Sequence, residues 1–246
     1  MADTREARAH AAEIKIVVDA ALGAQIRDWA RLHLDPDPHG SGPFGDEYLT
    51  TSLYFDTSAR DVFHRRGSFG RAKYRIRRYG QSGPVFLERK LRKPGLLVKR
   101  RTKVALEDLR RLEDDSMKDW WLGKWFRRRV VARRLEPVCQ LTYHRVARGT
   151  TTSTGPARLT VDDAIRVTPI DSVDFVTGSG LPVLEGRTIV EMKFRAHLPR
   201  QFEALLDEFQ LRPQAASKYR HGMAVISGLS LQDEPEPVVV GPDGHV

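Results

Sequence analysis

The sequence predicts an α+β protein built on an eight-stranded antiparallel β-barrel, a tunnel, with flanking helices. Cations recur at every second position in three successive runs, residues 71–79, 85–91 and 97–103. Because side chains of a strand alternate between its two faces, each run would have one basic face and one apolar face. The same alternation returns in most of the other predicted strands. Eight strands in all are enough to close a barrel.

The first part of the chain predicts a lead-in, a strand, a helix, a loop, a strand and a short helix, in that order. Their bounds are residues 1–10, 13–18, 20–33, 35–46, 48–55 and 59–64. The lead-in is charged, and we expect it to be flexible. Asp19 is a suitable N-cap for the first helix, whose apolar stripe passes through Ile26 and Trp29. The loop is rich in Pro, Gly and Asp.

The three basic strands come next and are joined by turns at residues 80–83 and 93–95, which contain Gly, Ser and Pro. Residues 106–135 then change to helical spacing, with Trp121, Trp125 and Phe126 on one side. A basic, Trp-rich amphipathic helix can lie on a membrane. Packing of the aromatic stripe onto the domain is the more frequent arrangement, and we favour it.

The last part predicts three more strands and two more helices. The strands are residues 138–147, 158–162 and 189–195, and the helices are residues 199–209 and 218–229, the second capped by Ser217. A Thr/Ser/Gly loop covers residues 149–156, and a long excursion at 168–187 contains a candidate strand at 172–177. We expect one domain over residues 11–230 and a disordered tail over 231–246.

The composition favours an anionic partner. The chain has 246 residues, with 41 Lys plus Arg against 32 Asp plus Glu, a formal charge of +9. Its hydrophobic share of 40% suffices for an ordinary core. Cys139 is the only cysteine, so no disulfide forms within the chain. No apolar run of spanning length and no secretory signal are present, and we expect a cytoplasmic protein.

A barrel with apolar faces outward, under the helices, would have a lumen lined with Arg and Lys. Two cations about 6 Å apart repel by about 3 kcal/mol at an effective dielectric near 20, so the lumen needs an anionic occupant. Nucleic acid is too wide for an eight-stranded barrel, and the strands have no ladder of aromatic residues for stacking single strands. A polyphosphate or a nucleoside triphosphate tail fits better, since Arg offers forked donors and Lys a point charge. An ordinary solvated polar face is the alternative interpretation.

Three carboxylates share the basic phase: Glu13, Glu88 and Glu191. Carboxylates beside phosphate-binding lysines suit Mg²⁺ or Mn²⁺, which take oxygen ligands together with substrate phosphates. Each Glu would otherwise only neutralise a neighbouring Lys. The sequence has no Walker-type phosphate loop, no CxxC and no HExxH.

Taken in order, several short motifs resemble the VTC domain, the polyphosphate polymerase branch of the triphosphate tunnel metalloenzymes. These motifs are Lys73-Tyr-Arg75-Ile-Arg77, Leu87-Glu88-Arg-Lys90, Val98-Lys99, Tyr143-His-Arg145, Arg158-Leu-Thr-Val-Asp162, Val190-Glu191-Met-Lys193 and Ser217-Lys218-Tyr219. The resemblance spans about residues 13–223. It implies a tunnel barrel that transfers the terminal phosphoryl group of ATP to a polyphosphate chain with a divalent metal, Mn²⁺ or Mg²⁺.

The resemblance and the face pattern together give the candidate site. The residues expected to act in catalysis are Arg75, Arg77, Lys90, Arg145 and Arg158. The residues expected to bind substrate phosphates are Lys15, Lys73, Lys99, Arg101, Tyr143, Lys193, Ser217 and Lys218. Glu191 is the expected metal ligand, and Glu88 and Glu13 are further candidates. Ser217 and Lys218 would close one tunnel mouth.

One position departs from the family pattern. Fungal members have a Lys two residues before the Ser of the C-terminal motif, whereas Ala215 stands here. Hydrolysis of triphosphate or polyphosphate therefore stays an alternative to polymer synthesis. A third alternative is a non-catalytic polyanion-binding module for RNA or anionic lipid, with weak peripheral membrane contact through residues 120–134.

Overall fold

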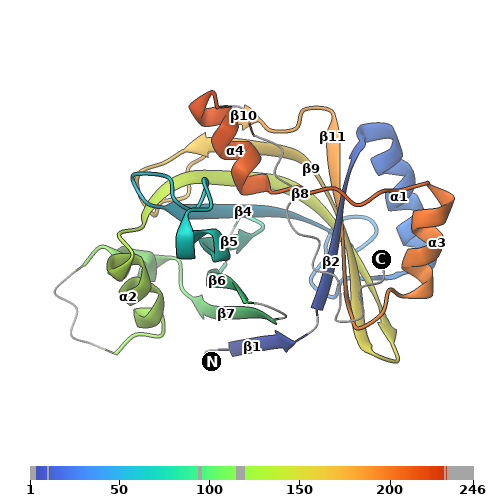
Figure 1. Ribbon diagram of the computed structural model, residues 1–246, viewed down its shortest axis with the longest axis horizontal. Helices are drawn as coiled ribbons and strands as arrows, with labels where there is room; N and C mark the ends of the chain where they lie inside the picture. The colour runs from blue at the N-terminus through green and yellow to red at the C-terminus, as the bar shows by residue number, and fades with distance from the viewer. Residues whose placement is uncertain are drawn as a thin grey trace.

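The computed structural model describes residues 4–9, 11–81, 83–93, 96–114, 120–229 and 231. One antiparallel sheet dominates it and curls through most of a turn (Figure 1). In sheet order its strands are β1 (Thr4–Ala9), β7 (Leu96–Val104), β6 (Val85–Lys93), β5 (Ala72–Tyr79), β4 (Glu47–Asp56), β8 (Glu136–Thr152), β9 (Gly155–Pro169), β11 (Arg187–Arg195) and β2 (Ala11–Asp19). Two short strands, β3 (Asp35–Pro36) and β10 (Leu181–Pro182), pair with β8 and β9.

The helices lie around this sheet. They are α1 (Ala20–His33), η1 (Gly67–Arg71), η2 (Glu107–Leu112), α2 (Lys124–Ala132), α3 (Arg200–Glu208) and α4 (Lys218–Ser227). Helices α1 and α3 lie beside β2, β9 and β11, and α2 lies near β6 and β7 at the opposite side (Figure 1). The predicted class, an α+β fold with an antiparallel tunnel-like sheet and flanking helices, is confirmed, but the predicted closure of eight strands into a barrel is not: the main path among the described residues has nine strands and stays open. The sheet path ends at β1 and β2, and no ladder joins these two strands among the described residues.

The apolar faces predicted for the strands lie on the outer side of the sheet, where they pack against the helices. Ile14, Ile16 and Val18 on β2 are buried, and they belong to a core cluster with Ile26 and Phe202 of α1 and α3. A second cluster forms around Phe126 of α2. There Phe55 and Tyr74 reach the Phe126 ring at centroid distances of 5.5 and 6.0 Å. Burial of these aliphatic and aromatic side chains is the main stabilising contribution to such a sheet.

The predicted start of the first helix is confirmed in detail. Asp19 caps α1, and its side chain accepts a hydrogen bond from the Leu22 backbone N–H at 2.8 Å. Ile26, Trp29 and Ala30 are buried as the apolar stripe requires, whereas Leu32 is exposed. A side-chain oxygen at the N-cap satisfies one of the unpaired N–H groups of the first turn.

Several boundaries differ from prediction. The expected lead-in, residues 1–10, contains strand β1, which pairs with β7. Residues 59–64 form turns and not a helix, because the Asp56 carboxylate accepts the backbone N–H groups of Thr57, Val62 and Phe63 and folds the chain back on itself. The candidate strand at 172–177 is irregular: Gln140 exchanges hydrogen bonds with the Val176 backbone at its end.

Two further segments differ in extent from their prediction. The helical region 106–135 consists of η2 and α2 with residues 115–119 outside the described part of the chain. The loop predicted at 149–156 is mostly strand, since β8 and β9 pair as far as Thr152 and Gly155. Thr and Ser tolerate an exposed hairpin as readily as a loop. The expected tail beyond residue 231 and parts of both predicted turns, residues 82 and 94–95, also lie outside the described residues.

Helix α4 packs on the inner face of the sheet at the end where β4 finishes and β5 begins. Three consecutive residues at its start are anchored to three strands or their ends. Ser217 Oγ accepts a hydrogen bond from Lys73 Nζ at 3.0 Å. Lys218 Nζ lies 2.6 Å from Asp162 Oδ2, and the Tyr219 hydroxyl donates to Asp56. Helix α4 therefore covers this end of the concave face, and the assignment of Ser217 and Lys218 to a tunnel mouth stays a prediction.

Within the described part of the chain, every helix is too short or too polar to cross a bilayer.

Candidate active site

The charged face of the sheet is its concave face, and its two halves meet across the lumen. Lys90 Nζ on β6 donates a 2.9 Å hydrogen bond to Glu13 Oε2 on β2. Five strands separate β6 from β2 in the sheet order, so the contact is possible only because the sheet curls back on itself. An ion pair thus joins the halves that backbone pairing leaves apart. The concave face is therefore spanned by an ion pair, and we call the space between its two halves the tunnel.

One side of the tunnel, which we call the arginine wall, consists of Arg75, Arg77, Glu88, Lys99 and Arg101 on β5, β6 and β7. The register places Arg75, Glu88 and Arg101 side by side across these strands. Arg75 and Lys99 lie 2.7 and 3.1 Å from the two Glu88 carboxylate oxygens, and Arg101 lies 3.2 Å away. Burial would raise the pKa of Glu88, but these cations hold it well below its usual value.

Arg77 extends this wall toward β4 and β8. Its guanidinium donates to Ser52 Oγ and to the Tyr143 hydroxyl, both at 3.0 Å, and the side chain is buried. Beside it, burial would raise the pKa of Tyr79, but Arg77 and Arg101 lower it to about 8. A tyrosine pKa shifted downward despite burial indicates a strongly positive potential in the lumen.

The opposite side, which we call the glutamate wall, consists of Glu13, Lys15, Glu191 and Lys193 on β2 and β11. In the ladder Glu191 is opposite Lys15, and Lys193 is opposite Glu13. Lys15 Nζ lies 2.9 Å from Glu13 Oε1, and Lys193 Nζ lies 2.5 Å from Glu191 Oε1. Burial and the neighbouring Glu13 carboxylate would raise the pKa of Glu191, but Lys193 and the other lysines lower it. Both carboxylates are therefore ionised.

A third cluster of charged side chains lies near α4, on strands β8 and β9 between the two walls. Arg145 binds Asp162 through both ends of its guanidinium fork, at 2.6 and 2.7 Å. Lys218 meets the same carboxylate from α4. Burial would raise the pKa of Asp162, but Arg145 and Lys218 lower it strongly. A bidentate pair of this kind fixes the orientation of the arginine.

The glutamate wall fits a divalent metal shared with a substrate. Glu13 and Glu191 are two ionised carboxylates in one buried cluster, and they are the hard oxygen donors that Mg²⁺ and Mn²⁺ prefer. Among the described residues, no group of three or more His, Cys, Asp or Glu side chains gathers. The protein therefore supplies too few ligands for a closed cage, and phosphate oxygens would complete the coordination. Glu88 does not join this pair, because its oxygens are engaged by the arginine wall.

The structure brings the predicted site residues to one concave face. The predicted cations found there are Lys15, Lys73, Arg75, Arg77, Lys90, Lys99, Arg101, Arg145, Arg158, Lys193 and Lys218. Arg158 is the most exposed of those with a recorded ion pair, with 41% of its side chain accessible, and it lies between Tyr48 and Asp37 at the mouth opposite α4. Tyr143 and Ser217 lie inside as predicted, each bonded to a lumen cation.

Four residues of the lumen have no role predicted from the sequence: Tyr48, Ser52, Tyr54 and Asp162. Three of them alternate along β4, where Tyr54 accepts a 3.2 Å hydrogen bond from Arg75. Their period of two was visible in the sequence, but uncharged residues on a strand do not by themselves indicate a lumen. Asp162 ends one of the predicted motifs, but only the fold shows that Arg145 and Lys218 converge on its carboxylate.

Comparisons with known proteins concern the family and the fold of this chain. A model of the VTC domain family matches residues 10–227. A candidate adenylate cyclase from Bacillus halodurans has a similar structure, with a TM-score of 0.54 at 15% identity, over 86% of this chain and 95% of that one. A candidate adenylyl cyclase from Hippeastrum, described as having a dominant triphosphatase activity, has a TM-score of 0.47 at 17% identity, over 90% of this chain and 97% of that one. A search of curated proteins finds no significant match.

Proposed function

Because the chain belongs to the VTC domain family, a branch of the triphosphate tunnel metalloenzymes, we propose that it is a metal-dependent polyphosphate polymerase. It would transfer the terminal phosphoryl group of ATP to the end of a polyphosphate chain held in the tunnel. The observation that carries this proposal is the convergence of cations from both halves of the sheet on one cavity, joined by the Lys90–Glu13 contact.

The charge balance of the lumen supports two anions and not one. Its eleven predicted cations face five carboxylates, Glu13, Asp37, Glu88, Asp162 and Glu191, among the described residues. A nucleoside triphosphate tail carries about four negative charges. A divalent metal would offset two of them. An excess of cations remains for a second anion, and a polyphosphate acceptor supplies that charge.

The protonation states of the lumen also favour a phosphate acceptor over water. Water needs a general base with a pKa near the working pH, whereas a phosphate oxygen is already anionic. The carboxylates Glu13, Glu88, Asp162 and Glu191 all have lowered pKa values, which makes them weak bases. Hydrolysis of triphosphate or polyphosphate stays the alternative. The Hippeastrum protein is itself described as having a dominant triphosphatase activity.

In the proposed mechanism the protein positions and stabilises charge and forms no covalent bond with the substrate. Arg75, Arg77 and Lys90 align the phosphoryl oxygens, and Arg145 is held in place by Asp162. Helix α4 places Lys218 at the closed mouth. When bound, the metal supplies charge neutralisation at phosphate oxygens, and Glu13 and Glu191 are the residues that would hold it.

The test is to incubate the protein with ATP and Mn²⁺ and analyse the products. The proposal expects an acid-labile polymer and ADP. Free phosphate as the main product would establish hydrolysis, and no turnover with salt-sensitive, metal-independent binding would favour a binding module. Arg75→Ala and Lys90→Ala should each reduce turnover by at least a hundredfold, whereas Arg212→Ala, an exposed cation outside the tunnel, should not. Full activity in both tunnel variants would overturn the assignment.

A further inference from the structure

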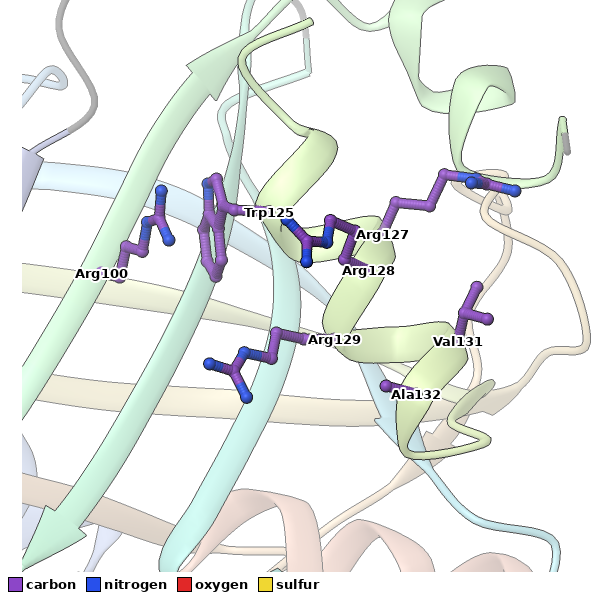
Figure 2. A pocket seen from close by; sticks show the side chains of 7 residues that line it. All are labelled: Arg100, Trp125, Arg127, Arg128, Arg129, Val131 and Ala132. Atoms are coloured by element: carbon purple, nitrogen blue, oxygen red, sulfur yellow. The ribbon is translucent and has the colours of Figure 1, made fainter. Parts of the chain in front are cut away.

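A second basic site lies outside the tunnel, between α2 and β7. It is a cavity of about 500 Å³ lined by Arg100, Trp125, Arg127, Arg128, Arg129, Val131 and Ala132 (Figure 2). We call this set the outer arginine pocket. Its arginines come from two elements that are far apart in sequence. The neighbouring residues of β7, Lys99 and Arg101, bind Glu88 in the tunnel, so Arg100 faces the opposite side of the sheet.

The wall of the pocket is fixed before any ligand arrives. Trp125 Nε1 donates a 2.8 Å hydrogen bond to Thr102 Oγ1 on β7. The Arg100 guanidinium lies over the Trp125 ring, 4.2 Å from its centroid, and Figure 2 shows the two side by side with Arg129 on the same side of the helix. A locked indole and a stacked guanidinium lose little conformational freedom when a ligand binds.

The described part of this region carries an excess of positive charge. Residues 120–135 contain six cations, Lys124 and five arginines at positions 127–129, 133 and 134, and no Asp or Glu. Arg128 and Arg129 are exposed, and no ion pair to either is recorded among the described residues. Across the β6–β7 ladder Arg89 is directly opposite Arg100.

The shape and chemistry of the pocket select a phosphate-bearing ligand. Guanidinium groups bind phosphate oxygens through forked pairs of hydrogen bonds, and several arginines around one cavity suit an anion with more than one phosphate group. A membrane surface is disfavoured, because the apolar face of α2 is already used. Phe126 is fully buried and Val130 packs on the core. The exposed Val131 on α2 and Trp120 before it are single apolar side chains and not the continuous apolar face that inserts between lipids.

We propose that the outer arginine pocket is a second anion site, distinct from the tunnel, that binds a soluble ligand carrying two or more phosphate groups. The proposal does not depend on which reaction the tunnel performs. Strand β7 lies between the two sites: Lys99 and Arg101 face the tunnel and Arg100 faces the outer arginine pocket. A ligand bound in the pocket would therefore contact a strand that also lines the tunnel.

The test uses inorganic tripolyphosphate titrated calorimetrically into the full chain and three variants. The wild type should show two binding events. Arg128→Gln with Arg129→Gln should weaken one event at least tenfold and leave the other, because two forked donors are lost from the pocket. Arg77→Gln should weaken only the other event. Arg200→Gln with Arg212→Gln, an equal loss of exposed charge far from α2, should leave both events unchanged.

Each result decides the proposal. It is overturned if the wild type shows one event that only Arg77→Gln weakens, or if the pocket variant retains both events. If the wild type shows only the event that the pocket substitutions weaken, the tunnel function is contradicted and the outer site is supported. A parallel arm sediments the protein with phosphatidylserine vesicles: vesicle binding abolished by the pocket substitutions, without a tripolyphosphate event there, would overturn the soluble ligand in favour of a lipid headgroup.

Discussion

The two walls of the tunnel use the same residue types in different proportions. The arginine wall surrounds one carboxylate, Glu88, with Arg75, Lys99 and Arg101. The glutamate wall sets two carboxylates, Glu13 and Glu191, among lysines. Arginine forks hold phosphate in fixed directions, while flexible lysines beside paired carboxylates leave room for a metal. In the proposed function, the arginine wall would orient phosphates and the glutamate wall would hold the metal.

The variant with the largest expected effect disrupts the arginine wall. Glu88→Gln should lower the free energy of unfolding by about 3 kcal/mol, because it removes the one carboxylate that compensates three partly buried cations. Urea denaturation measures this change. Added tripolyphosphate should restore more stability to Glu88→Gln than to the wild type, since the anion takes over the compensation.

The control for this prediction is Glu185→Gln, an exposed position, which should change stability by less than about 0.5 kcal/mol. If Glu88→Gln is as stable as this control, the cations of the arginine wall do not depend on Glu88.

The second prediction separates the walls by function. Glu191→Gln should reduce metal-dependent turnover at least a hundredfold, which corresponds to about 2.7 kcal/mol, because the glutamate wall loses one oxygen donor. Its stability should fall less than that of Glu88→Gln, since Glu13 still compensates the lysines. Mn²⁺ affinity, measured by electron paramagnetic resonance in the absence of nucleotide, gives a readout independent of activity. Unchanged Mn²⁺ affinity would remove Glu191 from the metal position.

A smaller effect tests helix α4, whose Lys218 lies on Asp162. Tyr219→Phe removes the hydrogen bond from α4 to Asp56 and should cost about 2 kcal/mol of stability, because the acceptor is a buried carboxylate. Asp56 keeps its three backbone donors, so the fold should persist. The KM for ATP should rise as Lys218 loses its fixed position. Tyr74→Phe is the matched control, a buried tyrosine on the outer side. Equal stability of the two variants would contradict the anchoring role.

The smallest expected effect reports the potential of the arginine wall. One tyrosine, Tyr79, should ionise near pH 8, and the Tyr79→Phe variant should lack this transition in the absorbance of tyrosinate. Its pKa in the folded state is below the ordinary value near 10, so ionisation adds stability as the pH rises from about 8 to 10, and this gain is absent below about pH 8. Bound tripolyphosphate should raise the Tyr79 pKa. A transition that does not move would place the anion away from this wall.

Much of the tunnel was predictable because strand periodicity is local. Lys73, Arg75 and Arg77 share a face in any extended chain, and Ile14, Ile16 and Val18 require a core on the other side. Those two facts place the charged side chains on the face opposite the core. The N-cap at Asp19 and the Ser217 start of α4 are local as well, and both were predicted.

Other features depend on contacts between distant residues. The strand at residues 4–9 has no apolar alternation and forms through pairing with β7. The turns at residues 59–64 replace a predicted helix because a carboxylate at position 56 captures their N–H groups.

The sequence alone determined which side chains face the lumen, since alternation follows from the geometry of each strand. Only the tertiary structure decided how those charges combine. The curl of the sheet brings Lys90 to Glu13, separates Glu88 from the other two glutamates, and places Lys218 on Asp162. Pairing across a tunnel depends on the shear and curvature of the whole sheet, and no local pattern encodes either.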